Sequence, residues 1–549
     1  MKKLLLAGFL IAFQSLQSQD LIQHIPQNSS IILEVNVPKI LEALPLTEFE
    51  NSDIGKELLK TLSEVFESRI TSLTDIGINT NFSQYIFMVD KGNNIEFVYL
   101  LPLTNANLIQ QKMEQNQNKI INESGYNKVY HYDPITTINW NESLLSIVIN
   151  MKIDEYGGLP DTGNSSSNYL SKISSTITNN TSFNKHKTKS KETAVNFWMG
   201  NLSDNISSLI KFDKKTGSLI ATPNLIKNLY NDYKSFSLNL YFEEKETRIT
   251  TAMEFSPEYS KTLKKTFKHR FNKDLFNYVD IDNSLAYFSN NIDTEEALKQ
   301  NLRYLDEKVI PNTAESSYKE EMSLGITLIS TLLDEEAIGE IIKGDFLFVL
   351  SGISEREVEY TTYTYDSSFN RLPVVKTKME KVPDFIAMAS TGENKLLPKT
   401  ISYLESKNFI ENQSGYYKIN AGTEVPFDYY FMIKNDIIFL GTSRSQFQNI
   451  VNGSYVPRVS SKSKKEILKG HTTFYIGIGK AQNYISKEDF SSEKEYNKIL
   501  DLIMNTPDIF FSAKKIRGNT ATSSLLFMTP EGYKNGLEYI MSFIDKLSK

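Results

Sequence analysis

Residues 120–129 read IINESGYNKV, and residues 410–419 read IENQSGYYKI. At a constant offset of 290, six of the ten positions carry the same residue. We interpret the two stretches as copies of one structural unit. Because glycine tolerates the left-handed conformation that ends a helix, each copy predicts a helix that stops at the glycine, Gly125 or Gly415, and is followed by a strand.

Further landmarks repeat in the same order along the chain. Residues 472–479 mirror residues 193–200 at an offset of 279, and residues 528–531 mirror residues 255–258 at an offset of 273. Insertions of different length in surface loops explain offsets that shrink along the chain. The whole chain is therefore predicted to be internally duplicated.

Alternating apolar runs separated by short polar tips outnumber any strand-helix-strand crossover pattern, which favours antiparallel sheets. Apolar stripes at helical spacing predict helices that cover these sheets. We therefore predict an α+β fold of two tandem homologous halves, residues 19–271 and 272–549, each with antiparallel strands covered by helices. The two halves are expected to superpose.

Two insertions distinguish the halves. Residues 157–192 are rich in Gly, Ser and Asn and have almost no apolar periodicity, which predicts a flexible loop in the first half. Residues 355–383 combine alternating Thr and Tyr, a polar turn at 366–370 and a return strand, which predicts a long hairpin arm. The corresponding tip in the first half is only residues 90–94.

The first 18 residues have the order of a secretory signal peptide, with Lys2 and Lys3, then an apolar run, then small polar residues. We therefore expect export, to the periplasm or to the periphery of an outer membrane. The chain has no cysteine, so neither a disulfide nor a lipid-bearing cysteine is expected. No later run has the length and apolarity of a transmembrane anchor.

Several chemistries are disfavoured by the sequence. A formal net charge of −6 gives no basic surface for nucleic acid. The motifs at Ser203, Ser208 and Lys215 resemble those of penicillin-recognising serine enzymes, but their order and their spacing are wrong for that cleft. We therefore assign no catalytic, cofactor-binding or metal-ligating residue and expect no cofactor. The histidines are never closer than 55 residues and form no local zinc motif: His24, His131, His186, His269 and His471.

Aromatic residues give the only candidate contact site. Tyr360, Tyr363 and Tyr365 fall in the predicted arm, where exposed tyrosines on a strand are typical of a contact surface. Ordinary cross-strand packing is the competing interpretation. Trp140 and Trp198 also fall in β-prone runs.

The opening IPQNSS at residues 25–30, followed by Val35, Asn36 and Val37 behind a signal peptide, resembles a family of exported Bacteroidota proteins classified as a domain of unknown function. Length and layout agree across most of the chain. The resemblance implies no catalytic residues. Members are often lipoproteins, whereas this chain lacks the cysteine that would carry the lipid.

The leading hypothesis is an exported, non-enzymatic envelope protein that acts as a binding or assembly factor, with another envelope protein as its partner. Whether the chain catalyses a reaction is left open. One alternative is an envelope hydrolase whose carboxylates converge only in the fold, and a second is a carrier of an apolar ligand.

Overall fold

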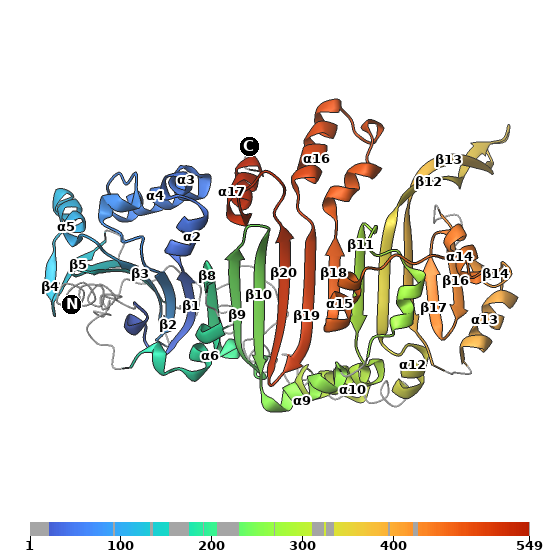
Figure 1. Ribbon diagram of the computed structural model, residues 1–549, viewed down its shortest axis with the longest axis horizontal. Helices are drawn as coiled ribbons and strands as arrows, with labels where there is room; N and C mark the ends of the chain where they lie inside the picture. Colours follow the sequence, from blue (N-terminus) through green and yellow to red (C-terminus); the bar gives the residue numbers. More distant parts are fainter. Residues whose placement is uncertain are drawn as a thin grey trace, which may run out of the picture. The chain divides into compact units, whose positions relative to one another are not determined.

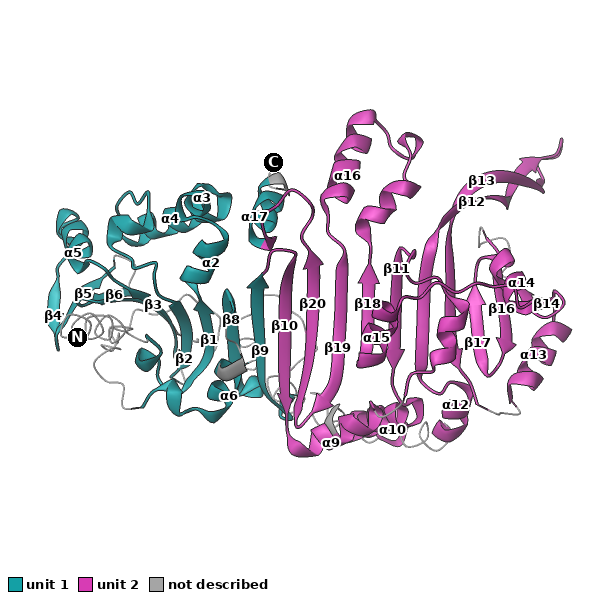
Figure 2. Ribbon diagram, viewed as in Figure 1, with its two compact units in different colours: residues 1–242, 537–549 teal, residues 243–536 magenta. Residues whose placement is uncertain are grey.

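The computed structural model contains two compact units, one of residues 1–242 with 537–549 and one of residues 243–536 (Figure 2). Unit 1 ends at residue 242 before the chain enters unit 2, and the C-terminal helix α17 (Gly536–Leu547) lies mostly in unit 1. There Leu537 and Met541 pack against Leu44. The structure describes residues 21–547 except 92–93, 132–134, 153–174, 190–191, 206–229, 268–269, 310–322, 326–333, 393–395 and 421–426.

The described strands of unit 1 form an antiparallel sheet in the order β4-β5-β6-β7-β3-β2-β1-β8-β9 (Figure 1). The strands are β1 (Ser29–Val35), β2 (Gln84–Asp90), β3 (Asn94–Pro102), β4 (Ile121–Glu123), β5 (Tyr126–Tyr130), β6 (Thr136–Trp140), β7 (Leu144–Lys152), β8 (Val195–Gly200) and β9 (Tyr233–Phe242). The helices are η2 (Leu21–His24), α2 (Val37–Ala43), α3 (Leu46–Asn51), α4 (Asp53–Val65), η3 (Leu73–Ile76), α5 (Ala106–Gln115), η5 (Ile177–Asn179) and α6 (Thr181–Lys189).

Both faces of the unit 1 sheet carry a hydrophobic core. Leu144 and Leu145 are neighbours on β7, and because side chains alternate along a strand they belong to different clusters. The cluster around Leu144 includes residues of η2, η5 and α6, and the cluster around Leu145 includes residues of α4, η3 and α5. Trp198 lies in the first cluster and Trp140 in the second, so both tryptophans are buried.

The described strands of unit 2 form an antiparallel sheet in the order β14-β15-β16-β17-β13-β12-β11-β18-β19-β20-β10. They are β10 (Glu246–Phe255), β11 (Ala286–Asn291), β12 (Asp345–Tyr365), β13 (Arg371–Ser390), β14 (Ile410–Asn412), β15 (Tyr417–Ile419), β16 (Tyr429–Lys434), β17 (Ile437–Gly441), β18 (Gly470–Ile476), β19 (Ile509–Arg517) and β20 (Thr520–Met528). The helices are α9 (Pro257–Thr266), η7 (Lys273–Tyr278), α10 (Thr294–Tyr304), η8 (Leu305–Val309), α12 (Glu335–Ile341), α13 (Leu396–Ser406), α14 (Arg444–Val451), α15 (Ser461–Lys469), η11 (Ile478–Tyr484), η12 (Lys487–Asp489) and α16 (Glu493–Asn505). With helices and antiparallel sheets in both units, the α+β prediction is confirmed.

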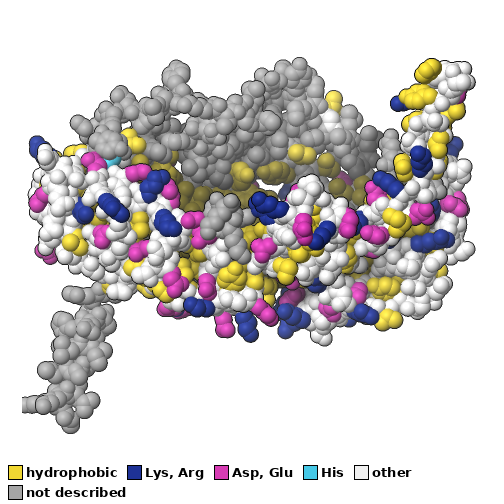
Figure 3. Space-filling model, turned by 90° about the horizontal axis from the view of Figure 1, so that it is seen from above, with side chains coloured by type: hydrophobic (Ala, Val, Ile, Leu, Met, Phe, Trp, Pro, Cys, Tyr) yellow, Lys and Arg dark blue, Asp and Glu magenta, His cyan; other side chains and the backbone are white. Residues whose placement is uncertain are grey.

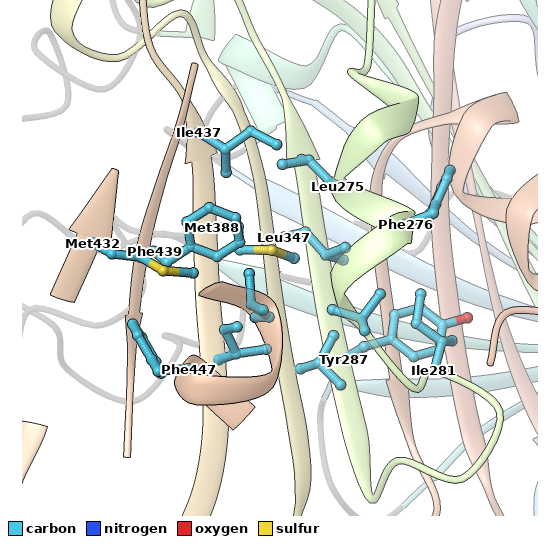
Figure 4. Packing of buried hydrophobic residues seen from close by; sticks show 14 of the residues in the cluster. Leu275, Phe276, Ile281, Tyr287, Leu347, Met388, Met432, Ile437, Phe439 and Phe447 are labelled. Carbon is cyan, nitrogen blue, oxygen red and sulfur yellow. The ribbon is translucent and has the colours of Figure 1, made fainter. Parts of the chain in front are cut away.

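One large hydrophobic cluster lies on one face of the unit 2 sheet, where strand residues meet η7, α14 and α15 (Figure 4). Phe439 of β17 and Phe447 of α14 are both fully buried in it. Leu275 of η7 also reaches the cluster and is 0% exposed. These contacts hold the central strands of unit 2, including β12 and β13, which extend beyond the sheet.

The repeated Ser-Gly pair forms a hairpin turn instead of a helix end, so the prediction of a helix stop at Gly125 and Gly415 is wrong. Ser124 and Gly125 have φ values of 54° and 82° and join β4 to β5, while Ser414 and Gly415 have φ values of 61° and 114° between β14 and β15. Two successive residues with positive φ match the twist of a short hairpin. The predicted strand after each glycine is present.

The two helices end earlier, and in the same way. Gln117 after α5 and Asn408 after α13 both have a φ of 58°. The next amides bond backwards, from Asn118 to the Met113 carbonyl and from Phe409 to the Leu404 carbonyl, at 3.0 and 2.9 Å. This left-handed helix end usually carries glycine, so Gln and Asn at these positions concealed it.

The predicted flexible loop at 157–192 contains a helix, so the prediction is wrong for residues 181–189. These residues form α6, in which Phe183 is 2% exposed and packs edge-on against Trp198 at 5.4 Å. Tertiary burial of this one aromatic ring offsets a weak apolar pattern. Residues 157–174 of the predicted loop lie outside the described residues.

Candidate functional site

The sequence-predicted contact tyrosines lie on a long hairpin of unit 2. Strands β12 and β13 pair continuously from Ile353↔Pro383 to Tyr365↔Arg371, and a turn at 366–370 joins them (Figure 1). We call residues 353–383 the arm. β12 pairs with β11 only up to Leu350, so the arm extends past the sheet.

Charged groups fix the base of the arm. The Arg356 guanidinium forms an ion pair with Asp384 on the opposite strand and donates to the Thr442 carbonyl, next to β17. Because a charge-assisted pair holds both strands at the point where they leave the sheet, the arm emerges in a defined direction.

A second contact ties the arm to the segment of η11 and η12. Lys381 Nζ donates to the Tyr484 carbonyl at 3.0 Å and forms an ion pair with Asp489. Its hydrogen bond, together with the Ser486 amide, lowers the pKa of Asp489. Gly352 allows this approach, since a side chain there would collide with the Tyr484 hydroxyl.

Apolar side chains stand exposed on both faces of the arm. Alternation along β12 places Tyr363 and Tyr365 on one face and Tyr360 on the other. They are 53%, 58% and 37% exposed, so all three sequence-predicted site residues reach solvent. Figure 3 shows hydrophobic side chains along this projecting ribbon. Further exposed apolar residues on the arm are Ile353, Leu372, Val375 and Met379.

Cations lie over two of the tyrosine rings. Arg371 is 4.9 Å from the ring centre of Tyr363, and Lys378 Nζ is 5.5 Å from that of Tyr360. Such contacts contribute about 0.5–1 kcal/mol each at exposed sites. Cross-strand packing therefore accounts for part of the environment of Tyr360 and Tyr363, and the remaining ring surface of both is exposed.

The tip of the arm presents an exposed phenylalanine in a strained conformation. Phe369 has a φ of 61° and is 86% exposed. Left-handed backbone is rare for a bulky residue, and Asn or Gly would adopt it at lower cost. Strain of this kind on a ring without burial favours a role in recognition. The sequence interpretation missed Phe369, although an aromatic residue inside the turn DSSFN was the available signal.

Other residues singled out from the sequence have structural roles. Asn205, in the serine-enzyme-like motif, is buried and donates to the carbonyls of Gly200 and Ser30. His186 is also buried, with its Nε2 2.7 Å from Asn196 Oδ1. Ser208, Lys215 and His269 lie outside the described residues. No group of three or more potential metal ligands gathers among the residues that the structure describes.

A second surface of interest is the face of the unit 2 sheet opposite its core. Phe288 is half-buried there, while its neighbour Tyr287 belongs to the core. Phe348 and Phe474 are paired with Phe288 from either side. The apolar row continues in register across the sheet through Phe431, Leu440, Ala387, Phe348, Phe288, Phe474, Phe511, Leu525 and Ile249.

Within the described part of the chain, no helix combines the length and the apolarity that crossing a membrane requires. No protein-family model matches the chain, and no curated protein matches it. Among solved structures, crystal form IV of TP0453 has 11% identity and a TM-score of 0.26, covering 42% of this chain and 79% of that chain. Crystal form I of TP0453 has 11% identity and a TM-score of 0.24, with coverages of 47% and 89%. Both the sequence identity and the structural score are low.

Proposed function

We propose that this protein is an exported, non-enzymatic binding or assembly factor of the cell envelope, and that the arm contacts another envelope protein. The observation that carries the proposal is the arm itself, anchored at its base and exposing Tyr363, Tyr365 and Phe369. Export rests on the signal-peptide pattern of residues 1–18, which lie outside the described residues. Because the chain has no cysteine, the proposal includes no lipid anchor.

The energetics of a free ribbon support a contact role. An isolated two-stranded hairpin is marginal in water, because it has no core to bury its side chains. Here the Arg356–Asp384 and Lys381–Asp489 pairs fix the base, while Val375 and Met379 remain 62% and 63% exposed. A rigid base lowers the entropy lost on binding, and exposed apolar rings gain free energy when a partner covers them.

The proposal includes descent from two tandem homologous halves, supported by the ladders of strand pairs. We call a ladder the row of residues that are paired from one strand to the next across a sheet. In unit 1 this ladder leads from Lys128 to Asn196 through Asn139, Ser146, Leu100, Tyr85 and Glu34. In unit 2 the equivalent ladder leads from Lys418 to Tyr475 through Tyr430, Gly441, Ile386, Val349 and Tyr287.

Lys128 and Lys418 are 290 residues apart, and Asn196 and Tyr475 are 279 apart. These are the two offsets that the sequence repeat predicts. One strand further, β9 pairs Asn239 with Asn196, and β19 pairs Phe510 with Tyr475. Asn239 and Phe510 are 271 residues apart, two fewer than the 273 between the repeated stretches that begin at residues 255 and 528. A slip of two residues keeps every side chain on its face of the sheet.

The arm is the feature that most clearly separates the two halves on this interpretation. In unit 1, β2 ends at Asp90 and β3 begins at Asn94, so the equivalent hairpin has no extension. A structural requirement shared by both halves would not explain an extension in one of them. The arm therefore fits a function acquired by the second half.

The test replaces residues 359–378 with an Asn-Gly turn in the full chain. We expect the melting temperature to stay nearly unchanged, because none of the residues that form the four buried hydrophobic clusters lies between 359 and 378. Recovery of one reproducible partner from crosslinked envelopes, read by mass spectrometry, should be lost. A control variant with Tyr130→Ser removes an exposed tyrosine outside the arm and should keep the partner. Unchanged recovery without the arm would refute the proposal.

A carrier of an apolar ligand is the second candidate, and the apolar row through Phe288 and Phe348 favours it. The test measures binding of a fluorescent fatty acid to the full chain and to Phe348→Ser. Loss of binding in Phe348→Ser, but not in the arm replacement, would favour the carrier. The hydrolase alternative has no comparable observation in its favour.

A further inference from the structure

We propose that the outer edge of β12 in the arm, residues 353–365, is a docking edge for an extended strand of the partner protein, and that this strand carries basic residues opposite Glu355 and Glu357. The inference rests on the proposed function and specifies its partner. In this mode the partner adds a strand to the arm through backbone hydrogen bonds, while alternate side chains supply specificity.

Both edges of the arm lack a neighbouring strand among the described residues. β12 pairs with β11 over Asp345–Leu350 and β13 pairs with β17 over Ile386–Ser390, and these pairings end before the arm begins. At the base of the β13 edge the Pro383 carbonyl accepts a hydrogen bond from Thr442 Oγ1 at 2.6 Å, and further along neither arm strand pairs with a third strand among the described residues. Unpaired edges of this kind are templates for another strand, and proteins usually protect them.

The two edges differ in their protection. β13 carries Pro373 and Pro383, which cannot donate a backbone hydrogen bond, together with Lys376, Lys378 and Lys381. Proline and lysine are the usual means of blocking an edge. The β13 edge is therefore unsuited to pairing with another strand.

The β12 edge has no such protection at its outer end. Residues 353–365 read ISEREVEYTTYTY, and the last six of them are uncharged, without proline, and composed of Tyr and Thr, which favour strands. Because the β13 edge is blocked and the β12 edge is open, a further strand can add to the arm on the β12 side only. The arrangement favours pairing with one strand on the β12 side.

Charge along β12 defines the chemistry of that strand. Glu355 and Glu357 lie on the same face as Tyr363, because they are an even number of residues apart. Both are exposed, and Lys381, which lies opposite Glu355 on β13, forms its ion pair with Asp489. Arg356 between them points to the other face and is held by Asp384. A partner strand with alternating Lys or Arg at one end and apolar residues at the other complements this pattern.

A second copy of the arm does not provide this complementarity. In parallel pairing, Glu355 and Glu357 would lie near the same residues of the other copy, and like charges in opposed strands are unfavourable. In antiparallel pairing centred on Thr361, Glu357 would lie opposite a tyrosine. Neither arrangement neutralises the two carboxylates.

The probe for the test is a fluorescent ten-residue peptide of alternating Val and Thr, with two lysines at alternate positions of its C-terminal half. Antiparallel pairing with β12 places these lysines opposite Glu355 and Glu357. Two control peptides carry glutamate in place of lysine, or methyl groups on alternate backbone nitrogens. Fluorescence anisotropy is measured on the full chain and on the double variant Glu355→Lys with Glu357→Lys.

We expect the lysine peptide to bind the native chain, the N-methylated peptide to fail, and the double variant to prefer the glutamate peptide. The change in affinity for each peptide should be roughly three- to tenfold, as two cross-strand charge pairs provide. Equal binding of both charged peptides, binding that survives N-methylation, or no binding at 1 mM peptide would overturn the inference.

Two further measurements separate other occupants. Arm-dependent dimerisation in analytical ultracentrifugation would assign the edge to a second copy, and Phe369-dependent binding to anionic vesicles would assign the arm to a lipid surface. Either outcome overturns the docking of a partner strand. The proposed function is judged independently, because loss of the crosslinked partner on arm replacement can hold while every peptide result is negative.

Discussion

Asp366 and Asn370 close the tip of the arm with three hydrogen bonds. Asp366 Oδ1 accepts from the Asn370 amide at 2.8 Å, Asp366 Oδ2 accepts from Asn370 Nδ2 at 3.0 Å, and the Asp366 amide donates to the Asn370 carbonyl at 3.1 Å. The Ser368 amide also donates to Asp366 Oδ1 at 2.8 Å. One carboxylate therefore organises the turn that presents Phe369.

The order of this turn is predicted to depend on pH. Hydrogen bonds from Asn370 are the main cause that lowers the pKa of Asp366 below its ordinary value of 3.8. A lowered pKa means that the ordered turn is favoured fully above pH 3.8 and loses this contribution as pH falls through the folded-state value. A spin label on Ser367→Cys, unique because the chain has no cysteine, should become more mobile in that range.

The matched control is Asp366→Asn in the same labelled chain. It keeps an oxygen that accepts hydrogen bonds but removes the titrating group, so mobility of the label should not change between pH 5 and pH 3. If the native chain and this variant respond to acid alike, the turn is not controlled by Asp366.

Replacing Phe369 with Asn is predicted to relax the tip and weaken recognition at once. Asn adopts a positive φ at lower cost than Phe, by about 1 kcal/mol. Amides of the turn should therefore exchange more slowly with deuterium, while recovery of the crosslinked partner falls. Slower exchange with undiminished recovery would mean that the exposed ring has no role in binding.

The sequence contains the local features of the arm but not its neighbours. Alternating Thr and Tyr around Tyr363 is sufficient to predict a strand, and the turn residues at 366–370 are sufficient to predict the return. The Arg356–Asp384 and Lys381–Asp489 pairs depend on the register and on packing against η12, so no local pattern reveals them.

The buried carboxylate of Glu34 in unit 1 also depends on long-range contacts, so the sequence did not predict it. Glu34 is 7% exposed, accepts a hydrogen bond from the Tyr85 hydroxyl at 3.0 Å, and forms an ion pair with Lys187. These three residues come from β1, β2 and α6. In sequence Glu34 is one acidic residue in an apolar strand, and only the fold shows that its carboxylate is buried and paired.

Phe439 and Leu440 are predicted to differ sharply in their effect on stability. Phe439 is 0% exposed in the unit 2 core, and Leu440 on the opposite face of β17 is 37% exposed. Phe439→Ala leaves a cavity and should cost about 3–5 kcal/mol, whereas Leu440→Ala should cost less than about 1 kcal/mol. Hydrogen exchange of peptides from β16 and β17 measures the stability loss in each variant. Tryptophan fluorescence is unsuitable here, because Trp140 and Trp198 lie in unit 1. Similar losses in the two variants would contradict the assignment of faces.

His471 is predicted to make unit 2 less stable in mild acid. Burial, and to a lesser degree the charge of Lys515, lowers the pKa of His471 from 6.5, and its ring stacks on Phe267 at 4.2 Å. The unfolded chain then binds the proton more readily, so stability is complete above pH 6.5 and declines as pH falls toward the folded-state value. Urea unfolding between pH 8 and pH 5 should show this slope. His471→Phe should reduce it, and an unchanged slope would assign the effect to other groups.

The final prediction compares the two glycines of the repeated stretch. Gly125 has a φ of 82° and open space where a Cβ would stand, whereas Gly415 has a φ of 114° and a Cβ there would lie 2.9 Å from Val451 Cγ1. Gly125→Ala should therefore cost about 1 kcal/mol from backbone strain alone, and Gly415→Ala should cost about twice as much. Trp140, paired with Asn127 beside the first turn, reports unit 1 by fluorescence, and near-ultraviolet circular dichroism follows unit 2. Ser124→Ala and Ser414→Ala are the matched controls, since they change a neighbouring side chain without altering either glycine. Equal losses for the two glycine variants would mean that Val451 yields freely and that backbone conformation alone requires glycine in both turns.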